Sequence, residues 1–254
     1  MPRIVRRVMI PESDEWVDAQ EGAELDHRHY DLPVIGRHST DVFKPDGSPL
    51  LLFRKRALDP AICEQARPAL RKAGRAHSPH RDLYSRIIGY YRDNEQSNCR
   101  LTAFTRDNLP EWGNVLPFVR AVNTVFRREL PSRYKVQRRI AYQTDREWTI
   151  ADTAFTTVTV NLWDATHDAR TKVHRDDGDL PDGFGVISIL RSGQYSGGQL
   201  IFPKYRVAVD MDTTDVLLCD VHEAHGNAPL IGEPGWERIA TILYYVTSMR
   251  ECAR

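Results

Sequence analysis

Two histidines and one aspartate in the C-terminal half of the chain have the types and spacing of a metal site. His174 and Asp176 are two residues apart, and side chains at that spacing lie on the same face of an extended strand. His225 follows an apolar run that is typical of another strand. Two imidazoles and one carboxylate can hold one face of Fe(II) and leave positions open for substrate and oxygen. His222 competes for the distal position, but the turn signal Gly226-Asn227 favours His225, at the end of a strand.

Arg238, on the next expected strand, could supply a fixed positive charge beside this metal. A guanidinium binds a carboxylate through two parallel N–H bonds, so Arg238 is a candidate clamp for an anionic co-substrate. A His-x-Asp pair alone is weak evidence for a metal site, because such pairs arise often by chance. The order of signals is more specific. The His-x-Asp pair is followed by Gly197-Gly198, which open one expected strand, and by Asp215, which starts an apolar strand. The pair His225-Gly226 comes next, and Arg238 is last.

Charge is unevenly distributed along the 254 residues, although Lys+Arg and Asp+Glu are equal at 35 each. Residues 67–150 contain 17 basic and 8 acidic side chains, whereas residues 151–254 contain 9 basic and 15 acidic ones. A basic segment beside an acidic, metal-binding half is typical of proteins with an anionic macromolecular partner. Arginines on solvated helix faces would give the same composition, and charge alone favours this second interpretation.

The cysteines and the N-terminus bear on the compartment. Cys63, Cys99, Cys219 and Cys252 show no CxxC spacing, which indicates neither a zinc ribbon nor a disulfide framework. Cys219 lies in an apolar run and is expected in the core. We therefore expect a reducing compartment, which Fe(II) would also require. The N-terminus has no apolar signal region and no run approaches transmembrane length, so we expect a soluble, intracellular protein with no membrane partner.

Three elements of the N-terminal half have clear local signals. Two apolar runs around the turn sequence PDG predict a hairpin near residues 41–53. An Asp-Pro pair predicts a helix over residues 59–74, which Pro68 is expected to kink or shorten. Regularly spaced apolar residues predict an amphipathic helix over residues 110–129, ended by Pro131.

Two basic stretches flank that second helix. Residues 76–100 lack periodicity and are expected to form a long loop, either a mobile lid or a surface for phosphate contacts and base stacking. Its candidate contact residues are Arg81, Tyr84, Arg86, Tyr90, Tyr91 and Arg92. Cations also gather around the C-terminal end of the helix, where they complement the helix dipole. They are Arg127, Arg128, Arg133, Lys135, Arg138 and Arg139.

After Thr153 the sequence changes to short strand-like runs separated by Gly, Pro and Asp. They are FTTVTVNLW, FGVISIL, GQLIFP, YRVAV, DVLLCD and RIATILYYV. Strands this close together predict a sandwich or barrel. We expect an α+β fold and a single catalytic domain over residues 1–254. Residues 1–150 would form a helical, basic support region, and residues 151–254 the jelly-roll core that carries the iron site.

Longer motifs resemble the Fe(II)/2-oxoglutarate-dependent dioxygenases, and more closely their TET/J-binding-protein (TET/JBP) branch, particularly its compact phage and microbial members. These motifs are CRLTAFT (99–105), AFTTVTVN (154–161), HRDDGDLPDGFGV (174–186), GGQLIFPKYRVAVDM (197–211) and DVHEAHGN (220–227). The resemblance implies a double-stranded β-helix (jelly-roll, cupin-like) core, with Fe(II) held by His174, Asp176 and His225. It also implies O2 as oxidant and 2-oxoglutarate bound between the iron and Arg238. Asn161 looks like the family's polar residue near this co-substrate.

One position departs from the family pattern. Many members place a hydroxyl two residues beyond this arginine, where the chain has Ala240. Thr241 is expected to point to the opposite face of the strand. We therefore expect 2-oxoglutarate binding to depend more heavily on Arg238, with Arg191 or Lys204 as the alternative clamp.

The resemblance also implies that the substrate is the 5-methyl group of a pyrimidine in DNA, with residues 67–150 as the expected DNA contact. Such a base must leave the duplex stack and enter a pocket. Asp179 either makes local turn contacts or faces that pocket. In the second case its carboxylate accepts a hydrogen bond from N4 of cytosine, whereas thymine shows an acceptor at O4. This favours 5-methylcytosine, giving 5-hydroxymethylcytosine or a more oxidised base, over thymine, giving 5-hydroxymethyluracil.

Other functions remain open from the sequence. The chain could hydroxylate a small molecule or a peptide, or it could be a binding module with a dormant iron site, although the intact candidate ligands argue against the last. We assume a monomer. If the chain is phage-encoded, the cytoplasm of a bacterial host is its expected location.

Overall fold

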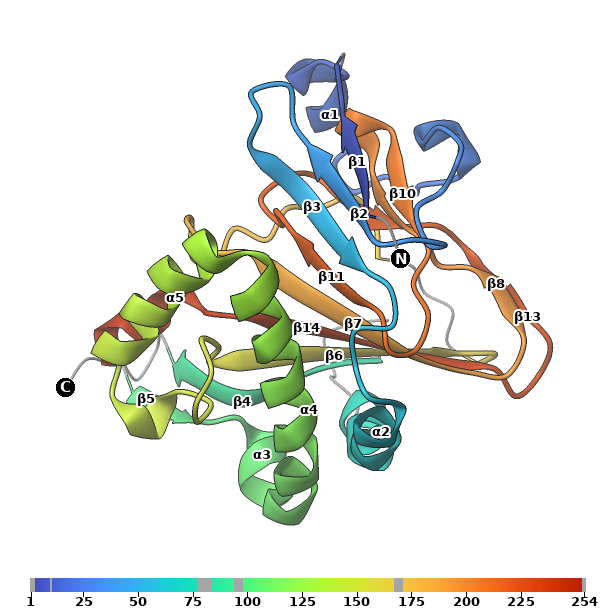
Figure 1. Ribbon diagram of the computed structural model, residues 1–254. Helices are drawn as coiled ribbons and strands as arrows, with labels where there is room; N and C mark the ends of the chain where they lie inside the picture. Colours follow the sequence, from blue (N-terminus) through green and yellow to red (C-terminus); the bar gives the residue numbers. More distant parts are fainter. Residues whose placement is uncertain (1–2, 10, 77–83, 94–97, 167–170, 253–254) are drawn as a thin grey trace.

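The computed structural model describes residues 3–9, 11–76, 84–93, 98–166 and 171–252. A nine-stranded sheet extends through the molecule in the order β1-β2-β3-β11-β7-β14-β6-β4-β5 (Figure 1). Neighbouring strands are antiparallel except β1 and β2, which are parallel. In chain order the strands are β1 (Ile4–Arg7), β2 (Thr40–Phe43), β3 (Pro49–Arg54), β4 (Tyr84–Asp93), β5 (Asn98–Leu101), β6 (Thr157–Asp164), β7 (Gly185–Ser192), β11 (Val216–Cys219) and β14 (Glu237–Tyr244). Both halves of the sequence thus build one sheet.

Two smaller sheets cover one face of the large sheet. One has the order β10-β9-β12 and the other pairs β13 with β8. Their strands are β8 (Tyr195–Gly197), β9 (Leu200–Phe202), β10 (Val207–Val209), β12 (Gly226–Asn227) and β13 (Leu230–Gly232). Leu200 and Phe202 of β9 belong to the same buried cluster as Ile187 and Ile189 of β7. Two facing sheets of this kind form the expected jelly-roll core.

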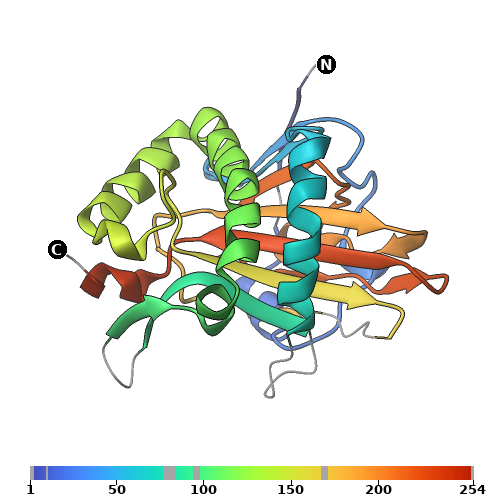
Figure 2. The ribbon, with the colours of Figure 1, turned by 90° about the horizontal axis from the view of Figure 1, so that it is seen from below.

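Helices cover the opposite face of the large sheet, where α2 and α4 lie side by side across the strands (Figure 2). The α-helices are α1 (Asp14–Asp18), α2 (Pro60–Arg75), α3 (Ala103–Asp107), α4 (Leu109–Glu129) and α5 (Pro131–Gln143). Short 3-10 helices are η1 (His27–His29), η2 (Arg146–Trp148), η3 (Pro203–Tyr205) and η4 (Thr247–Cys252). Within the described part of the chain, none of these helices is both long and apolar enough to cross a bilayer.

Side chains of β6 alternate between the two faces of the large sheet, so this one strand contacts both the helices and the smaller sheets. Val158, Val160 and Leu162 are buried against the helices, while the residues between them face the smaller sheets. Helix α2 approaches this strand closely at Gly74, where an added Cβ would lie 2.7 Å from Cβ of Leu162. A side chain at that position would therefore push the helix off the sheet.

The local predictions for the hairpin and the two longer helices are confirmed. Strands β2 and β3 form the hairpin, and Asp59 caps α2 by accepting a hydrogen bond from the backbone N–H of Ala61. Pro68 does not shorten α2, which continues to Arg75. Helix α4 ends at Glu129 as expected, but Pro131 begins a further helix, α5, that was not predicted from the sequence.

The prediction of a long loop over residues 76–100 is wrong for its described part. Strand β4 pairs with β6, and β5 pairs with β4. Two features explain why the sequence does not show this strand. The apolar side chain of Ile87 is 39% exposed, so apolar residues do not mark the buried face, and Gly89 adopts a left-handed φ of +98° that interrupts the alternation of side chains between the two faces. Arg81, one of the proposed contact residues, lies outside the described residues.

The expectation of no disulfide is also wrong. Cys99 in β5 is bonded to Cys252 in η4, with their Cα atoms 6.0 Å apart. The two residues are 153 positions apart in sequence, so no local spacing pattern could predict the disulfide bond. Cys219 is fully buried in β11, as predicted.

Candidate metal and co-substrate site

The backbone brings His174 and His225 directly opposite each other. Each donates its backbone N–H to the carbonyl of the other at 3.0 Å, and their rings are 4.4 Å apart between centroids. Nε2 of His174 lies 3.5 Å from Oδ1 of Asp176, and Nε2 of His225 lies 3.8 Å from Oδ2 of Asp176. The three ligand atoms are all within 4.8 Å of one another. This cluster can hold one metal ion, with a donor set that suits Fe(II).

Backbone carbonyls orient both imidazoles of the cluster. Nδ1 of His174 donates to the carbonyl of Lys172 at 2.8 Å, and Nδ1 of His225 donates to the carbonyl of Glu223 at 2.9 Å. With the proton held on Nδ1, each Nε2 keeps its lone pair for a metal. Burial lowers the pKa of His225 and the facing His174 lowers it further, so the ring stays neutral.

His222, the competing candidate, lies outside this cluster. Its Nδ1 is 3.1 Å from Oδ1 of Asp220, and this hydrogen bond raises the pKa of His222 against the effect of burial. Neither the ligand cluster nor the cavity beside it includes His222. The structure therefore places His225 in the candidate metal cluster and His222 outside it.

A cavity of about 610 Å³ opens beside the cluster, between the large sheet and the smaller sheets. Its sheet wall is formed by alternate residues of three strands, namely Ser85, Ile87, Thr157, Thr159, Asn161, Trp163, Arg238, Ala240, Ile242 and Tyr244. These residues face away from α2 and α4, because neighbouring residues in each strand occupy the helix side. The cavity is large enough for a small co-substrate together with part of a second molecule.

Arg238 lies in this wall as a buried cation without a carboxylate partner. It is 4% exposed, and its Nη2 donates to the carbonyl of Gly198 at 3.2 Å. The ring of Trp163 lies 4.9 Å from its Cζ. No carboxylate of the described ranges lies within ion-pair distance of it, and burial lowers its pKa. Because buried charges are ordinarily paired, Arg238 fits the far carboxylate of 2-oxoglutarate.

Two neutral groups near Arg238 have unused hydrogen-bonding capacity. Oδ1 of Asn161, a cavity-lining residue, and the hydroxyl of Tyr195 are both buried without a partner among the residues that the structure describes. Asn161 pairs in register with Ala240, the position that lacks the family's hydroxyl. Tyr195 was missed in the sequence, because its segment GQYSGGQL shows only turn signals. Its hydroxyl lies beside Arg238, but Tyr195 does not line the cavity.

Asp179 lines the cavity and is 8% exposed. Its backbone N–H also donates to the carbonyl of Asp176 at 3.3 Å, which is a turn contact of the backbone and not of the carboxylate. Burial raises the pKa of the Asp179 carboxyl to about 8, with a further contribution from the charge of Asp176. The carboxyl is then largely protonated at neutral pH and can donate a hydrogen bond as well as accept one.

The basic residues of segment 67–150 divide between the two faces of the large sheet. Tyr91 of β4 lines the cavity and carries Arg100 over its ring, with Cζ 5.1 Å from the centroid. Arg138 of α5 instead donates to the carbonyl of Thr153 and stacks on Tyr142, away from the cavity. The part of the segment nearest the candidate site is therefore β4 and β5.

Comparison with known proteins identifies the family. The model of the oxygenase domain of the 2OGFeDO superfamily (Tet_JBP) matches residues 85–247. Thymine dioxygenase JBP1 of Trypanosoma brucei brucei is 34% identical over 202 residues, covering 77% of this chain and 22% of that protein. The bifunctional helicase and thymine dioxygenase JBP2 of Leishmania tarentolae is 29% identical over 226 residues, covering 87% of this chain and 19% of that protein. The chain thus spans about a fifth of the length of these curated relatives.

A solved structure, NgTET1 in complex with 5mC DNA, matches with a TM-score of 0.64 at 15% identity, covering 87% of this chain and 81% of that one. At this identity the match shows the fold, and it confirms the double-stranded β-helix core. The family model covers more than half of the chain and includes the candidate metal residues and Arg238. The chain belongs to the TET/JBP family of Fe(II)- and 2-oxoglutarate-dependent dioxygenases.

Proposed function

We propose that this chain hydroxylates the 5-methyl group of a pyrimidine base in DNA. The observation that carries the proposal is the cluster of His174, Asp176 and His225 beside a cavity lined by a buried cation, Arg238, that has no carboxylate partner among the described residues. Curated relatives that are named thymine dioxygenases support the choice of a methyl-pyrimidine. The reaction would consume the methylated base, 2-oxoglutarate and O2, and release the hydroxymethyl base, succinate and CO2.

Each residue has a separate task in this reaction. His174, Asp176 and His225 would hold Fe(II) on one face, and Arg238 with Asn161 would bind 2-oxoglutarate. Bound Fe(II), with electrons from 2-oxoglutarate, supplies the activation of O2 that hydroxylation of a C–H bond requires. The apolar wall residues Ile187 and Leu200 would limit the access of water to the reacting centre. The protein's contribution is coordination, orientation and exclusion of water.

Thymine is the base that we propose first, because the similar relatives above are named as thymine dioxygenases. The preference for 5-methylcytosine depended on an ionised Asp179 that only accepts hydrogen bonds. Buried beside Asp176, this side chain gives no reason to exclude thymine. We retain 5-methylcytosine as the second candidate, because Asp179 lines the cavity and can also accept from N4.

Mass spectrometry of nucleosides from treated DNA tests this proposal. Duplexes that contain thymine and either cytosine or 5-methylcytosine are incubated with protein, Fe(II) and 2-oxoglutarate. We expect 5-hydroxymethyluracil, and Asp179→Asn should change the ratio of thymine to 5-methylcytosine oxidation several-fold, since one neutral hydrogen bond contributes about 1 kcal/mol. If 5-methylcytosine alone is oxidised, the second candidate replaces the first. If no base is oxidised, a small-molecule or peptide substrate becomes the better hypothesis.

We further propose that DNA reaches the cavity over β4 and β5, where Tyr91 can stack on a base. Tyr91→Ala should weaken binding of a labelled duplex roughly 10-fold in fluorescence anisotropy, because stacking of a base on an aromatic ring contributes about 1–3 kcal/mol. Tyr142 is the matched control, since it also has an arginine over its ring but lies on α5 and is 56% exposed. Equal losses in Tyr91→Ala and Tyr142→Ala would argue against this path.

A further inference from the structure

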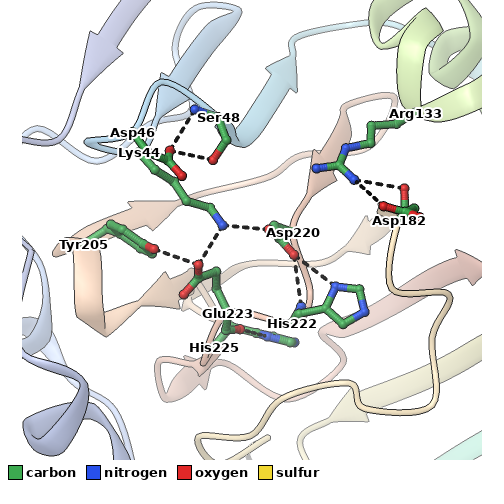
Figure 3. Close-up of polar contacts among 10 residues, drawn as sticks. All are labelled: Lys44, Asp46, Ser48, Arg133, Asp182, Tyr205, Asp220, His222, Glu223 and His225. Carbon is green, nitrogen blue, oxygen red and sulfur yellow. Dashed lines mark hydrogen bonds and ion pairs between the residues drawn. The ribbon is translucent and has the colours of Figure 1, made fainter.

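A lysine from the N-terminal hairpin joins two carboxylates behind the candidate metal site (Figure 3). Nζ of Lys44 lies 2.7 Å from Oδ2 of Asp220 and 2.6 Å from Oε1 of Glu223. The hydroxyl of Tyr205 also donates to Oε1 of Glu223 at 2.7 Å. The side chains of Lys44, Asp220 and Glu223 are each less than one-fifth exposed, so water screens these contacts little.

Asp220 and Glu223 are the two ends of one short turn, residues 220–223, that follows β11. The backbone N–H of Glu223 donates to the carbonyl of Asp220 at 3.3 Å, which closes the turn. At its start, the N–H of Asp220 donates to the carbonyl of Leu50 in β3 at 2.9 Å. The turn is therefore attached to the hairpin by its backbone and by Lys44.

The same turn holds two of the three candidate metal ligands. The carbonyl of Val221 accepts the backbone N–H of Asp176 at 3.0 Å. The carbonyl of Glu223 accepts Nδ1–H of His225 at 2.9 Å, which sets the tautomer and ring direction of that histidine. His174 is held differently, by the carbonyl of Lys172 at 2.8 Å. A change in the turn should thus affect Asp176 and His225 and spare the contact that orients His174.

We propose that Lys44 is a positioning residue for the metal site, acting through the turn 220–223. The inference rests on the proposed role of Asp176 and His225 as metal ligands. Without the ammonium, Asp220 would keep its contact with His222 and Glu223 its contact with Tyr205, but the two carboxylates would lose the cation that they share and would repel each other in a poorly solvated place. The turn would open, and its carbonyls would no longer hold the two ligands in register. Lys44 lies outside residues 85–247, the part that the family model matches.

The sign of the effect on metal affinity distinguishes positioning from simple electrostatics. Removing a positive charge near a cation site would by itself tighten metal binding, because it removes repulsion. Loss of positioning would weaken metal binding, because residues that orient metal ligands typically contribute roughly 10- to 100-fold in affinity. The two effects predict opposite results for one substitution.

Co(II) titration, followed by visible absorbance, measures this affinity without turnover. We expect Lys44→Met to bind Co(II) roughly 10- to 100-fold more weakly and with a changed ligand-field spectrum. Lys44→Arg, which keeps a charge between the carboxylates, should recover most of the affinity. The double variant Lys44→Met/Glu223→Gln should recover part of it, because one repelling charge is gone.

Lys55→Met is the matched control for a lost buried ion pair. Nζ of Lys55 lies 3.0 Å from Oδ2 of the fully buried Asp215, which has no hydrogen bond to the turn among the described residues. This variant should lose stability in a thermal melt without changing the Co(II) affinity or spectrum. Equal weakening in Lys55→Met and Lys44→Met would show a general folding defect and overturn the inference.

Comparison with His225→Ala separates this inference from the proposed function. Unchanged or tighter Co(II) binding in Lys44→Met, with binding lost in His225→Ala, would overturn the role of Lys44 and leave the metal site intact. Wild-type protein that binds no Co(II) would overturn the metal site itself, and the inference with it.

Discussion

His225→Ala is expected to remove both iron binding and 2-oxoglutarate turnover, whereas His222→Ala should retain most of each. Nε2 of His225 lies 3.8 Å from Oδ2 of Asp176, while Nδ1 of His222 lies 3.1 Å from Oδ1 of Asp220, and His222 is not part of the cluster. Loss of one of the three candidate ligands found among the described residues leaves too few donors to hold the ion with the correct geometry. Succinate release and anaerobic Fe(II) titration measure the two quantities separately.

His174→Ala and Asp176→Ala should give the same result as His225→Ala, because the three ligand atoms form one cluster. His222→Ala is the matched histidine control, since it removes the competing candidate ligand, which lies three residues before His225. If loss of His222 abolishes iron binding while loss of His225 does not, the ligand assignment must be exchanged between them.

Arg238→Lys is expected to raise the concentration of 2-oxoglutarate required for half-maximal turnover roughly 10- to 100-fold. Lysine keeps the charge but cannot make two parallel bonds to one carboxylate, and a hydrogen bond to a charged group contributes about 1.5–3 kcal/mol. The surroundings of Arg238 offer little compensation, because Ala240 has no hydroxyl. Steady-state kinetics at saturating DNA, with iron affinity measured in parallel, test this expectation.

Arg191→Lys is the control for the clamp. Its guanidinium is already engaged, donating to the carbonyl of Tyr195 at 2.9 Å and lying 3.7 Å from Asp210, and it does not line the cavity. Lys204, the other alternative, is paired with Asp14. A larger change in 2-oxoglutarate dependence for Arg191→Lys than for Arg238→Lys would transfer the clamp to Arg191.

Much of the site could be predicted because its signals are local. The two-residue spacing of His174 and Asp176 sets both side chains on one face of extended backbone, whatever the rest of the fold does. The alternating threonines and valines of β6 similarly predict that one face of the strand packs on the helices and that the other faces the cavity. The regular apolar spacing of α4 is local in the same sense.

Strand β4 shows why local signals fail beside the candidate site. A strand that lines an open cavity need not be apolar on that side, so Ser85, Ile87 and Tyr91 give no clean alternation. The left-handed backbone at Gly89 breaks the remaining pattern. The pairing with β6 that reveals the strand joins residues 68 to 78 positions apart, and no local window contains it.

The sequence by itself determined the chemistry of the candidate site: the types of its ligands, their order and the cation that accompanies them. Only the tertiary structure decided what holds them in place. The contact of Lys44 with Glu223, the bond between Cys99 and Cys252, and the position of Tyr195 beside Arg238 all depend on how strands pair. Lys44 and Glu223 are 179 positions apart. Contacts of this kind arise because burial of both faces of one sheet brings distant segments together, and the residues involved show no periodicity of their own.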